Sequence, residues 1–157
     1  MGDMEELKAL YAEGSKHSHY QILSKRLAVI MGNDGVEVKT RYEQERLAYI
    51  LKNININKKT ILDVGGNTGF FSFELIDHEA KMVHYYEGNR AHADFVRLAA
   101  KVLGVEDKIK ITNHYLSFSS ELENKSYDII LLLNVLHHLG DDYGDQTISK
   151  ENAKLDI

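Results

Sequence analysis

The stretch ILDVGGNTGFF, residues 61–71, passes from an apolar run to a cluster of glycines and small polar residues, and then to bulky aromatic residues. A short apolar run predicts a buried strand, and the aromatic segment after it predicts a helix. Glycines between the two permit backbone conformations and close approaches that a Cβ atom would block. Alone, this turn has two interpretations: a loop that binds a ligand, or a tight strand-to-helix turn without one.

The sequence from Lys59 onward alternates between strand-like and helix-like segments. The strand-like segments are KTILDV, KMVHYYE, KIKITNHY and YDIILLLNVL, and the segments GFFSFELIDHE and RAHADFVRLAAKVLG have the length of crossover helices. This alternation predicts an α/β fold in which helices flank a parallel sheet of about four strands and cover both of its faces. The apolar run 129–133 predicts a strand buried on both faces. Gly104 is predicted to end the helix formed by RAHADFVRLAAKVLG.

Residues 1–55 are predicted to form an N-terminal helical extension. Helical patterns cover residues 5–13, 20–31 and about 42–52, and a glycine-rich and polar break separates the last two. We therefore expect the extension to act as a lid over a cofactor-binding domain at 56–157. Tyr20 and the pair Arg41 and Tyr42 are its candidates for closing over a cofactor, while His17 and His19 are expected to be solvated or to belong to a lid.

Glu87 is a second feature that indicates a ligand. It ends the strand-like segment KMVHYYE, 24 residues after Asp63, and Gly88 leaves space beside it. Ligands of open α/β sheets bind outside the carboxyl ends of the strands, where an acidic residue about 20 residues beyond a glycine loop can accept hydrogen bonds from two ribose hydroxyls. A surface glutamate without a ligand is the alternative. Together, the loop and the glutamate predict a nucleoside-containing cofactor.

The order Asp63-x-Gly65-x-Asn67-x-Gly69 resembles motif I, D/E-x-G-x-G-x-G, of the class I S-adenosylmethionine-dependent methyltransferases. The segment YDIILLLNVLHHL, residues 127–139, is similar to motif IV of that family, and the resemblance extends over about residues 60–140. It implies a Rossmann-like fold and S-adenosylmethionine as the cofactor. It also implies a set of cofactor-binding residues: Asp63, Gly65, Gly66, Asn67, Gly69, Glu87, Tyr115 and Asn134.

Two positions depart from the pattern of the family. Asn67 stands where the family usually has its central glycine, although asparagine is the residue after glycine that best tolerates a left-handed conformation. After the third strand the family usually has an acidic residue that contacts the adenine amino group, whereas this sequence has Tyr115, preceded by His114. We expect backbone groups and stacking on an aromatic ring to hold the adenine instead, with weakened binding as the alternative.

His137 and His138 follow the fourth predicted strand, close to where the resemblance places a methyl acceptor. A histidine can take a proton from an acceptor hydroxyl because its ordinary pKa lies near neutrality. Methyl transfer depends chiefly on positioning, so a nucleophilic acceptor needs no dedicated base. A metal site is not expected, since these histidines and the pair Asp141 and Asp142 stand next to one another rather than at i, i+4 spacing.

Composition restricts the partners and the location. With 43% hydrophobic and 27% charged residues, the chain resembles an ordinary globular protein, and its net charge of -5 disfavours nucleic acid as a partner. The absence of cysteine excludes disulfides, thiolate metal sites and a cysteine nucleophile. The acidic start and the lack of a long apolar run predict a cytoplasmic protein without a membrane anchor. Protein, sugar and small-molecule acceptors remain open.

The resemblance also implies that part of the usual domain is absent. The family usually has seven strands in the order 3-2-1-4-5-7-6, whereas four are visible in this sequence. We therefore expect a C-terminally incomplete domain in which strand four lies at an edge. Either the chain is a fragment or a second copy covers this edge as a homodimer.

Three functions are compatible with these observations. The leading hypothesis is an S-adenosylmethionine-dependent methyltransferase. The alternative is a catalytically silent module that binds S-adenosylmethionine, another nucleoside or a partner. A nicotinamide-dependent oxidoreductase is disfavoured, because its glycines would follow the pattern G-x-G-x-x-G.

Overall fold

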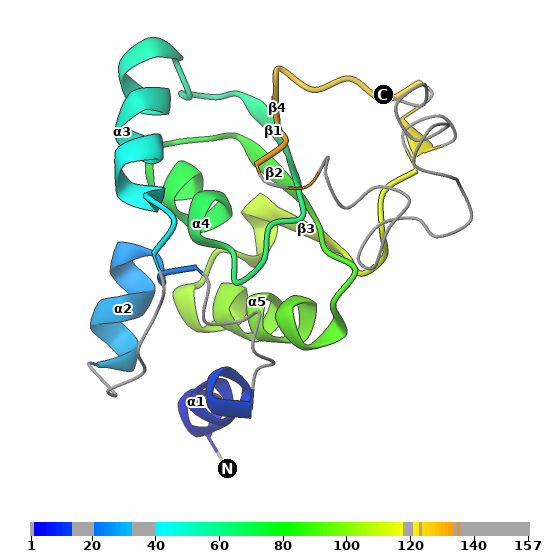
Figure 1. Ribbon diagram of the computed structural model, residues 1–157. Coiled ribbons are helices and arrows are strands. Elements are labelled where there is room, and N and C mark those ends of the chain that lie inside the picture. The colour runs from blue at the N-terminus through cyan, green and yellow to red at the C-terminus, as the bar shows by residue number, and fades with distance from the viewer. Residues whose placement is uncertain are drawn as a thin grey trace.

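The fold is a four-stranded parallel sheet packed against helices (Figure 1). The computed structural model describes residues 2–13, 21–32, 40–117, 121–122, 124–133 and 135. The strands are β1 (Thr60–Val64), β2 (Met82–Tyr86), β3 (Ile109–Thr112) and β4 (Ile129–Leu131). The helices are α1 (Asp3–Glu13), α2 (Lys25–Met31), α3 (Glu43–Asn53), α4 (Phe70–Asp77) and α5 (Arg90–Leu103), with a short 3₁₀ turn, η2 (Glu106–Lys108). Helices α1 to α5 of the described ranges pack on one face of the sheet rather than on both as the alternation predicts.

The order of the strands is β3-β2-β1-β4. Ile61 of β1 is in register with Val83 of β2 and with Ile129 of β4, and Val83 is in register with Ile109 of β3. Parallel strands place their carboxyl ends at one edge of the sheet. The turns after β1, β2 and β3 therefore meet at this edge, which positions the candidate site.

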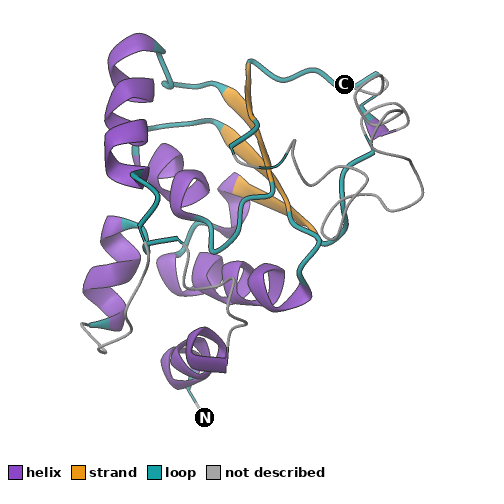
Figure 2. Cartoon of the chain, viewed as in Figure 1, coloured by secondary structure: helices purple, strands orange, loops and turns teal. Residues whose placement is uncertain are grey.

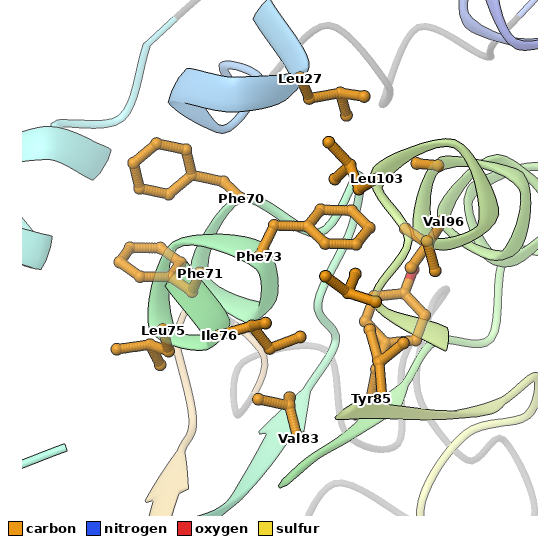
Figure 3. Packing of buried hydrophobic residues seen from close by; sticks show 14 of the residues in the cluster. Leu27, Phe70, Phe71, Phe73, Leu75, Ile76, Val83, Tyr85, Val96 and Leu103 are labelled. Atoms are coloured by element: carbon orange, nitrogen blue, oxygen red, sulfur yellow. The ribbon is translucent and has the colours of Figure 1, made fainter. Parts of the chain in front are cut away.

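The main hydrophobic core lies between the sheet and helices α4 and α5. Figure 3 shows Phe73 of α4 next to Val96 of α5 and near Tyr85 of β2, whereas Phe70 lies beside Phe71 on the other side of α4; all of them are buried. α4 begins where it does because Gly69, in a left-handed conformation, turns the chain out of the loop that follows β1. Burial of these aromatic side chains fixes the loop before α4 against the sheet.

The N-terminal helices extend the same core. The Tyr11 ring of α1 lies 5.5 Å from the Phe95 ring of α5, measured between centroids. α2 is attached to α4 by the ion pair between Arg26 and Asp77, at 2.6 Å. The division of the chain at residue 55 stays a prediction, but the described parts of residues 1–55 pack into one cluster with the sheet.

The other face of the sheet carries a hydrogen-bonded polar cluster. His84 of β2 is buried, with Nδ1 2.7 Å from the Tyr127 hydroxyl and Nε2 2.9 Å from the Thr112 hydroxyl. Burial lowers the pKa of His84 to about 4, aided by Lys110 and Lys125. The cluster attaches the chain that follows β3 to the sheet, and Figure 2 shows that chain on the side opposite α3 and α4.

Most of the expected elements are confirmed. All four strands are parallel, the crossover helices are α4 and α5, and Gly104 ends α5 with a φ of 67°. None of the helices in the described ranges has the length and apolar character needed to cross a bilayer.

Two predictions about individual elements are wrong. The helix predicted over residues 20–31 of the N-terminal extension is shorter than expected, because residues 21–24 are not helical and α2 begins at Lys25. The apolar run 129–133 does not form a strand buried on both faces. Only Ile129–Leu131 is a strand, and the Ile130 side chain is 49% exposed. Within the described sheet β4 pairs with β1 alone, so it lies at an edge as expected. A homodimer across this edge stays a prediction.

Candidate cofactor-binding site

Three turns at the carboxyl edge of the sheet bring the predicted site residues together. The first is the glycine loop 65–69 after β1, the second is 87–89 after β2, and the third is 113–115 after β3. Hydrogen bonds join all three. The amide of Asn67 donates to Glu87, and the side chain of Asn113 donates to the carbonyl oxygens of Glu87 and Gly88 at 2.8 and 3.3 Å.

Two glycines of the loop have left-handed backbones. Gly65 has a φ of 67° and Gly69 a φ of 82°, conformations that L-residues rarely adopt. A Cβ atom at Gly65 would overlap the side chain of Val135, and one at Gly69 would lie 2.9 Å from the Phe73 ring. The space beside these two glycines is therefore filled by side chains of the protein itself.

Gly66 is required by packing alone. Its φ is not positive, but a Cβ atom there would overlap the Tyr85 ring and lie 3.0 Å from the Asp63 carboxylate. Tyr85 is fully buried beneath the loop, and its hydroxyl donates to the carbonyl oxygen of Asn67. The glycine loop and the Tyr85 ring thus form one packed unit.

Asn67 is the centre of the loop, and it adopts the left-handed conformation that its place in the motif demands, with a φ of 52°. Its side-chain Oδ1 accepts from the amide of Thr68 at 2.8 Å. Its own amide donates to Oε2 of Glu87 at 2.9 Å. Asparagine at this position therefore supports the same turn that a glycine would form.

The Glu87 carboxylate is held in one orientation by the backbone. Oε2 accepts from the amide of Asn67, and Oε1 accepts from the amide of Asn89, each at 2.9 Å. The Glu87 side chain is 11% exposed, and His92 Nδ1 lies 3.9 Å from Oε2. The two amides orient the charged group before any ligand binds.

Tyr115 lies against the turn after β2. A Cβ atom at Gly88 would overlap the Tyr115 ring, so glycine is needed for the two turns to approach. Tyr115 as a whole is 45% exposed. The structure therefore brings the predicted aromatic residue next to the turn that carries Glu87.

Asp63 lies deeper than the other predicted site residues. Its side chain is 3% exposed, and Oδ2 accepts from the Ser72 hydroxyl at 2.7 Å. Burial raises the pKa of Asp63 to about 6, the Ser72 hydrogen bond opposes this, and the Glu87 charge adds to it. In this structure Asp63 fastens α4 to β1, and its contact with a cofactor stays a prediction.

Replacement of Asp63 by asparagine is expected to change how stability depends on pH. The pKa of Asp63 is raised in the folded chain above its ordinary value of 3.8, so its contribution to stability is fully present below about pH 3.8 and is lost as the pH rises to about 6. The free energy of unfolding of Asp63→Asn, relative to wild type, should therefore rise over this interval by up to about 3 kcal/mol.

Urea denaturation of both proteins between about pH 4 and 7 measures this difference. The contribution of His84, whose pKa is lowered, has the opposite sign, but it is common to both proteins and cancels. A constant difference across the interval would contradict the raised pKa of Asp63.

Sequence reasoning missed a group of residues that support the loop. Tyr85 is buried beneath the loop, and Thr68 is a buried residue of the loop itself. Asn89 caps α5 through hydrogen bonds from the amides of Ala91 and His92, and Gln21 of the N-terminal segment contacts the loop through Thr68. Asn89 could have been found, since asparagine before a helical pattern is an N-cap signal. Gln21 could not, because nothing local marks a contact across 47 residues.

Some predicted residues lie outside the described ranges. They are Asn134, His137 and His138, together with His17, His19 and Tyr20 of the extension. Arg41 and Tyr42 are described, and the Tyr42 side chain is 69% exposed at the start of α3. Among the described residues, no three His, Asp or Glu side chains are grouped so that they could hold a metal ion.

Comparison with known proteins rests on solved structures, since no family model and no curated protein matches the sequence. WbdD matches over 85% of this chain and 30% of its own, with a TM-score of 0.63 and 18% identity. A candidate S-adenosylmethionine-dependent methyltransferase from Listeria monocytogenes matches over 63% of this chain and 43% of its own, with a TM-score of 0.51 and 20% identity.

PH1948, a candidate RNA methyltransferase from Pyrococcus horikoshii, matches over 93% of this chain and 64% of its own, with a TM-score of 0.50 and 20% identity. The chain has the Rossmann-like fold of these structures. At these identities the likeness shows the fold alone, and this chain spans less than two thirds of each of the three proteins. In the Rossmann-like fold of this chain, the candidate site is the carboxyl edge of strands β1, β2 and β3.

Proposed function

We propose that the chain binds S-adenosylmethionine at the carboxyl edge of its sheet and acts as an S-adenosylmethionine-dependent methyltransferase. The observation that carries this proposal is the orientation of the Glu87 carboxylate by two backbone amides. An ionised carboxylate has about four acceptor positions, and the amides of Asn67 and Asn89 use two of them. The two that remain could accept the two hydroxyls of a ribose.

The hydrogen bonding of the glycine loop favours a cofactor without phosphate groups. The amides of Gly65 and Gly66 donate to the Tyr86 carbonyl oxygen at 2.8 and 3.2 Å, and that of Gly69 donates to Gly66 at 2.9 Å. The amides at residues 67, 68 and 70 donate to the side chains of Glu87, Asn67 and Gln21. A dinucleotide needs such amides for its pyrophosphate. Here all six from 65 to 70 already have acceptors.

Tyr115 provides a flat surface next to the proposed ribose position. Tyr115 is 45% exposed, and its ring lies against Gly88, one residue beyond Glu87. Aromatic side chains bind nucleobases by stacking, whatever the base. This supports the expectation that Tyr115 replaces the usual acidic contact to adenine.

The chemistry would come from the cofactor, and the chain would supply position. S-adenosylmethionine carries an electrophilic methyl group on a sulfonium, which an in-line nucleophile can displace. Glu87 and Tyr115 would hold the adenosine. The packed glycine loop would fix the distance between the cofactor and the sheet. The acceptor and a base role for His137 or His138 belong to this proposal, as does a cytoplasmic location.

Calorimetric titration with S-adenosylhomocysteine and with NAD tests the proposal. We expect saturable binding of the first and none of the second. An absence of binding to S-adenosylhomocysteine would contradict the proposed function. Binding without methyl transfer to any protein, sugar or small-molecule acceptor would favour the catalytically silent module instead.

A further inference from the structure

Gln21 connects the N-terminal segment to the glycine loop. Its Oε1 accepts from the Thr68 hydroxyl at 3.2 Å and from the amide of Phe70 at 3.1 Å. Phe70 is the first residue of α4, so its amide has no acceptor within the helix. Gln21 therefore supplies, from a distant segment, an acceptor for one of the unpaired amides at the start of α4.

The connection is reciprocal. Ser24, the N-cap residue of α2, makes no capping hydrogen bond through its side chain. The amide of Lys25, the first residue of α2, donates instead to the carboxylate of Glu74 at 2.5 Å. Glu74 is a buried residue of α4, and a negative charge at the start of α2 is favourable. Each of the two helices is thus capped by the other segment.

We propose that Gln21 is a positioning residue for the cofactor loop, so that attachment of the N-terminal segment and binding of cofactor are coupled. This rests on the proposed function. Thr68 follows Asn67, whose amide orients the Glu87 carboxylate, and Phe70 follows Gly69. Without Gln21, the amide of Phe70 and the hydroxyl of Thr68 lose their acceptor, and the loop populates other conformations.

Cofactor binds only the ordered loop. If a fraction of the chains has the loop ordered, the apparent dissociation constant is the intrinsic one divided by that fraction. A capping bond of ordinary strength changes the equilibrium constant between the ordered loop and its other conformations about tenfold, so its loss lowers the ordered fraction by up to about tenfold. Gln21→Ala should therefore raise the dissociation constant of S-adenosylhomocysteine by up to about tenfold, although Gln21 is not assigned a contact with cofactor.

Three variants keep the test specific. Gln21→Glu retains an acceptor oxygen and should bind within about threefold of wild type. Thr68→Val removes the buried hydroxyl and should weaken binding by less than Gln21→Ala, because the cap on Phe70 remains. Arg26→Ala is the matched control. It removes the ion pair with Asp77 and the hydrogen bond to the carbonyl oxygen of Leu103, which attach α2 to α4 and α5, but leaves the contacts of Gln21 with the loop in place. Arg26→Ala should bind S-adenosylhomocysteine with the dissociation constant of wild type.

The measurements are calorimetric dissociation constants, taken at a temperature where circular dichroism shows each variant folded. Wild type that does not bind S-adenosylhomocysteine would defeat the proposed function, and this inference with it. Wild-type binding with an unchanged constant in Gln21→Ala would overturn the positioning role alone. Equal weakening by Gln21→Ala and Arg26→Ala would also overturn it, because general loosening of α2 would then explain both.

Discussion

Gly66→Ala is expected to destabilise the folded chain by about 3 kcal/mol. The added Cβ atom would lie 2.5 Å from Cε2 of the Tyr85 ring and 3.0 Å from Oδ2 of Asp63. The ring has nowhere to move, because it is fully buried and its hydroxyl is bonded to the carbonyl oxygen of Asn67. Either the loop shifts and this hydrogen bond breaks, or the ring is forced into its neighbours. Urea denaturation at constant m-value measures the loss.

Gly104→Ala is the matched control for this prediction. Gly104 has a φ of 67°, but a Cβ atom there would have no neighbour within 4 Å. Its replacement should cost only the backbone strain, about 1–2 kcal/mol. Combining Gly66→Ala with Tyr85→Leu should cost less than the sum of the two single changes, because the smaller side chain leaves room. If Gly66→Ala is as stable as wild type, the prediction is wrong and the loop can move away from Tyr85.

The sequence was sufficient to predict the arrangement of the sheet. Apolar runs separated by crossover-length helices predicted four parallel strands, and the resemblance predicted the order that they have. These features are local, since each depends on a periodicity within one segment. The exposed side chain of Ile130 was not predictable in the same way, because burial depends on what lies beside a strand.

The glycine loop shows where the sequence was ambiguous. Glycines there predicted a close approach to the backbone, and the structure identifies neighbours that approach: Val135 at Gly65, Tyr85 at Gly66 and Phe73 at Gly69. Phe73 stands one helical turn after Gly69, but Tyr85 and Val135 come from distant parts of the chain that no signal near the loop indicates. The same holds for Gln21, whose contacts with Thr68 and Phe70 span 47 and 49 residues.

The loop glycines alone are therefore not evidence that a ligand binds at the loop. Their small size is already explained by the fold, through packing at Gly66 and left-handed backbones at Gly65 and Gly69. The functional interpretation therefore rests on Glu87. Its mostly buried carboxylate is compensated by hydrogen bonds from the amides of Asn67 and Asn89, and acceptor positions remain on it for a ligand.

Glu87→Gln is expected to weaken binding of S-adenosylhomocysteine by about 30-fold to 100-fold. Glutamine keeps one acceptor oxygen, but its amide group cannot accept, so it cannot serve both backbone amides and two ribose hydroxyls. Charge-assisted hydrogen bonds become neutral ones, which are about half as strong. Calorimetric titration measures the dissociation constant. Asp94→Asn, which removes the same charge from the exposed surface of α5, should bind like wild type.

An analogue of S-adenosylhomocysteine without the ribose 2′-hydroxyl distinguishes a direct contact between Glu87 and the ribose from a role of Glu87 in supporting the loop. If Glu87 accepts from this hydroxyl, wild type should bind the analogue much more weakly than the parent compound, whereas Glu87→Gln should bind the two within about threefold. If Glu87 only supports the loop, through the amides of Asn67 and Asn89, the variant should lose affinity for both ligands by the same factor. That second pattern would remove Glu87 from the ribose contact while leaving it a part of the turn.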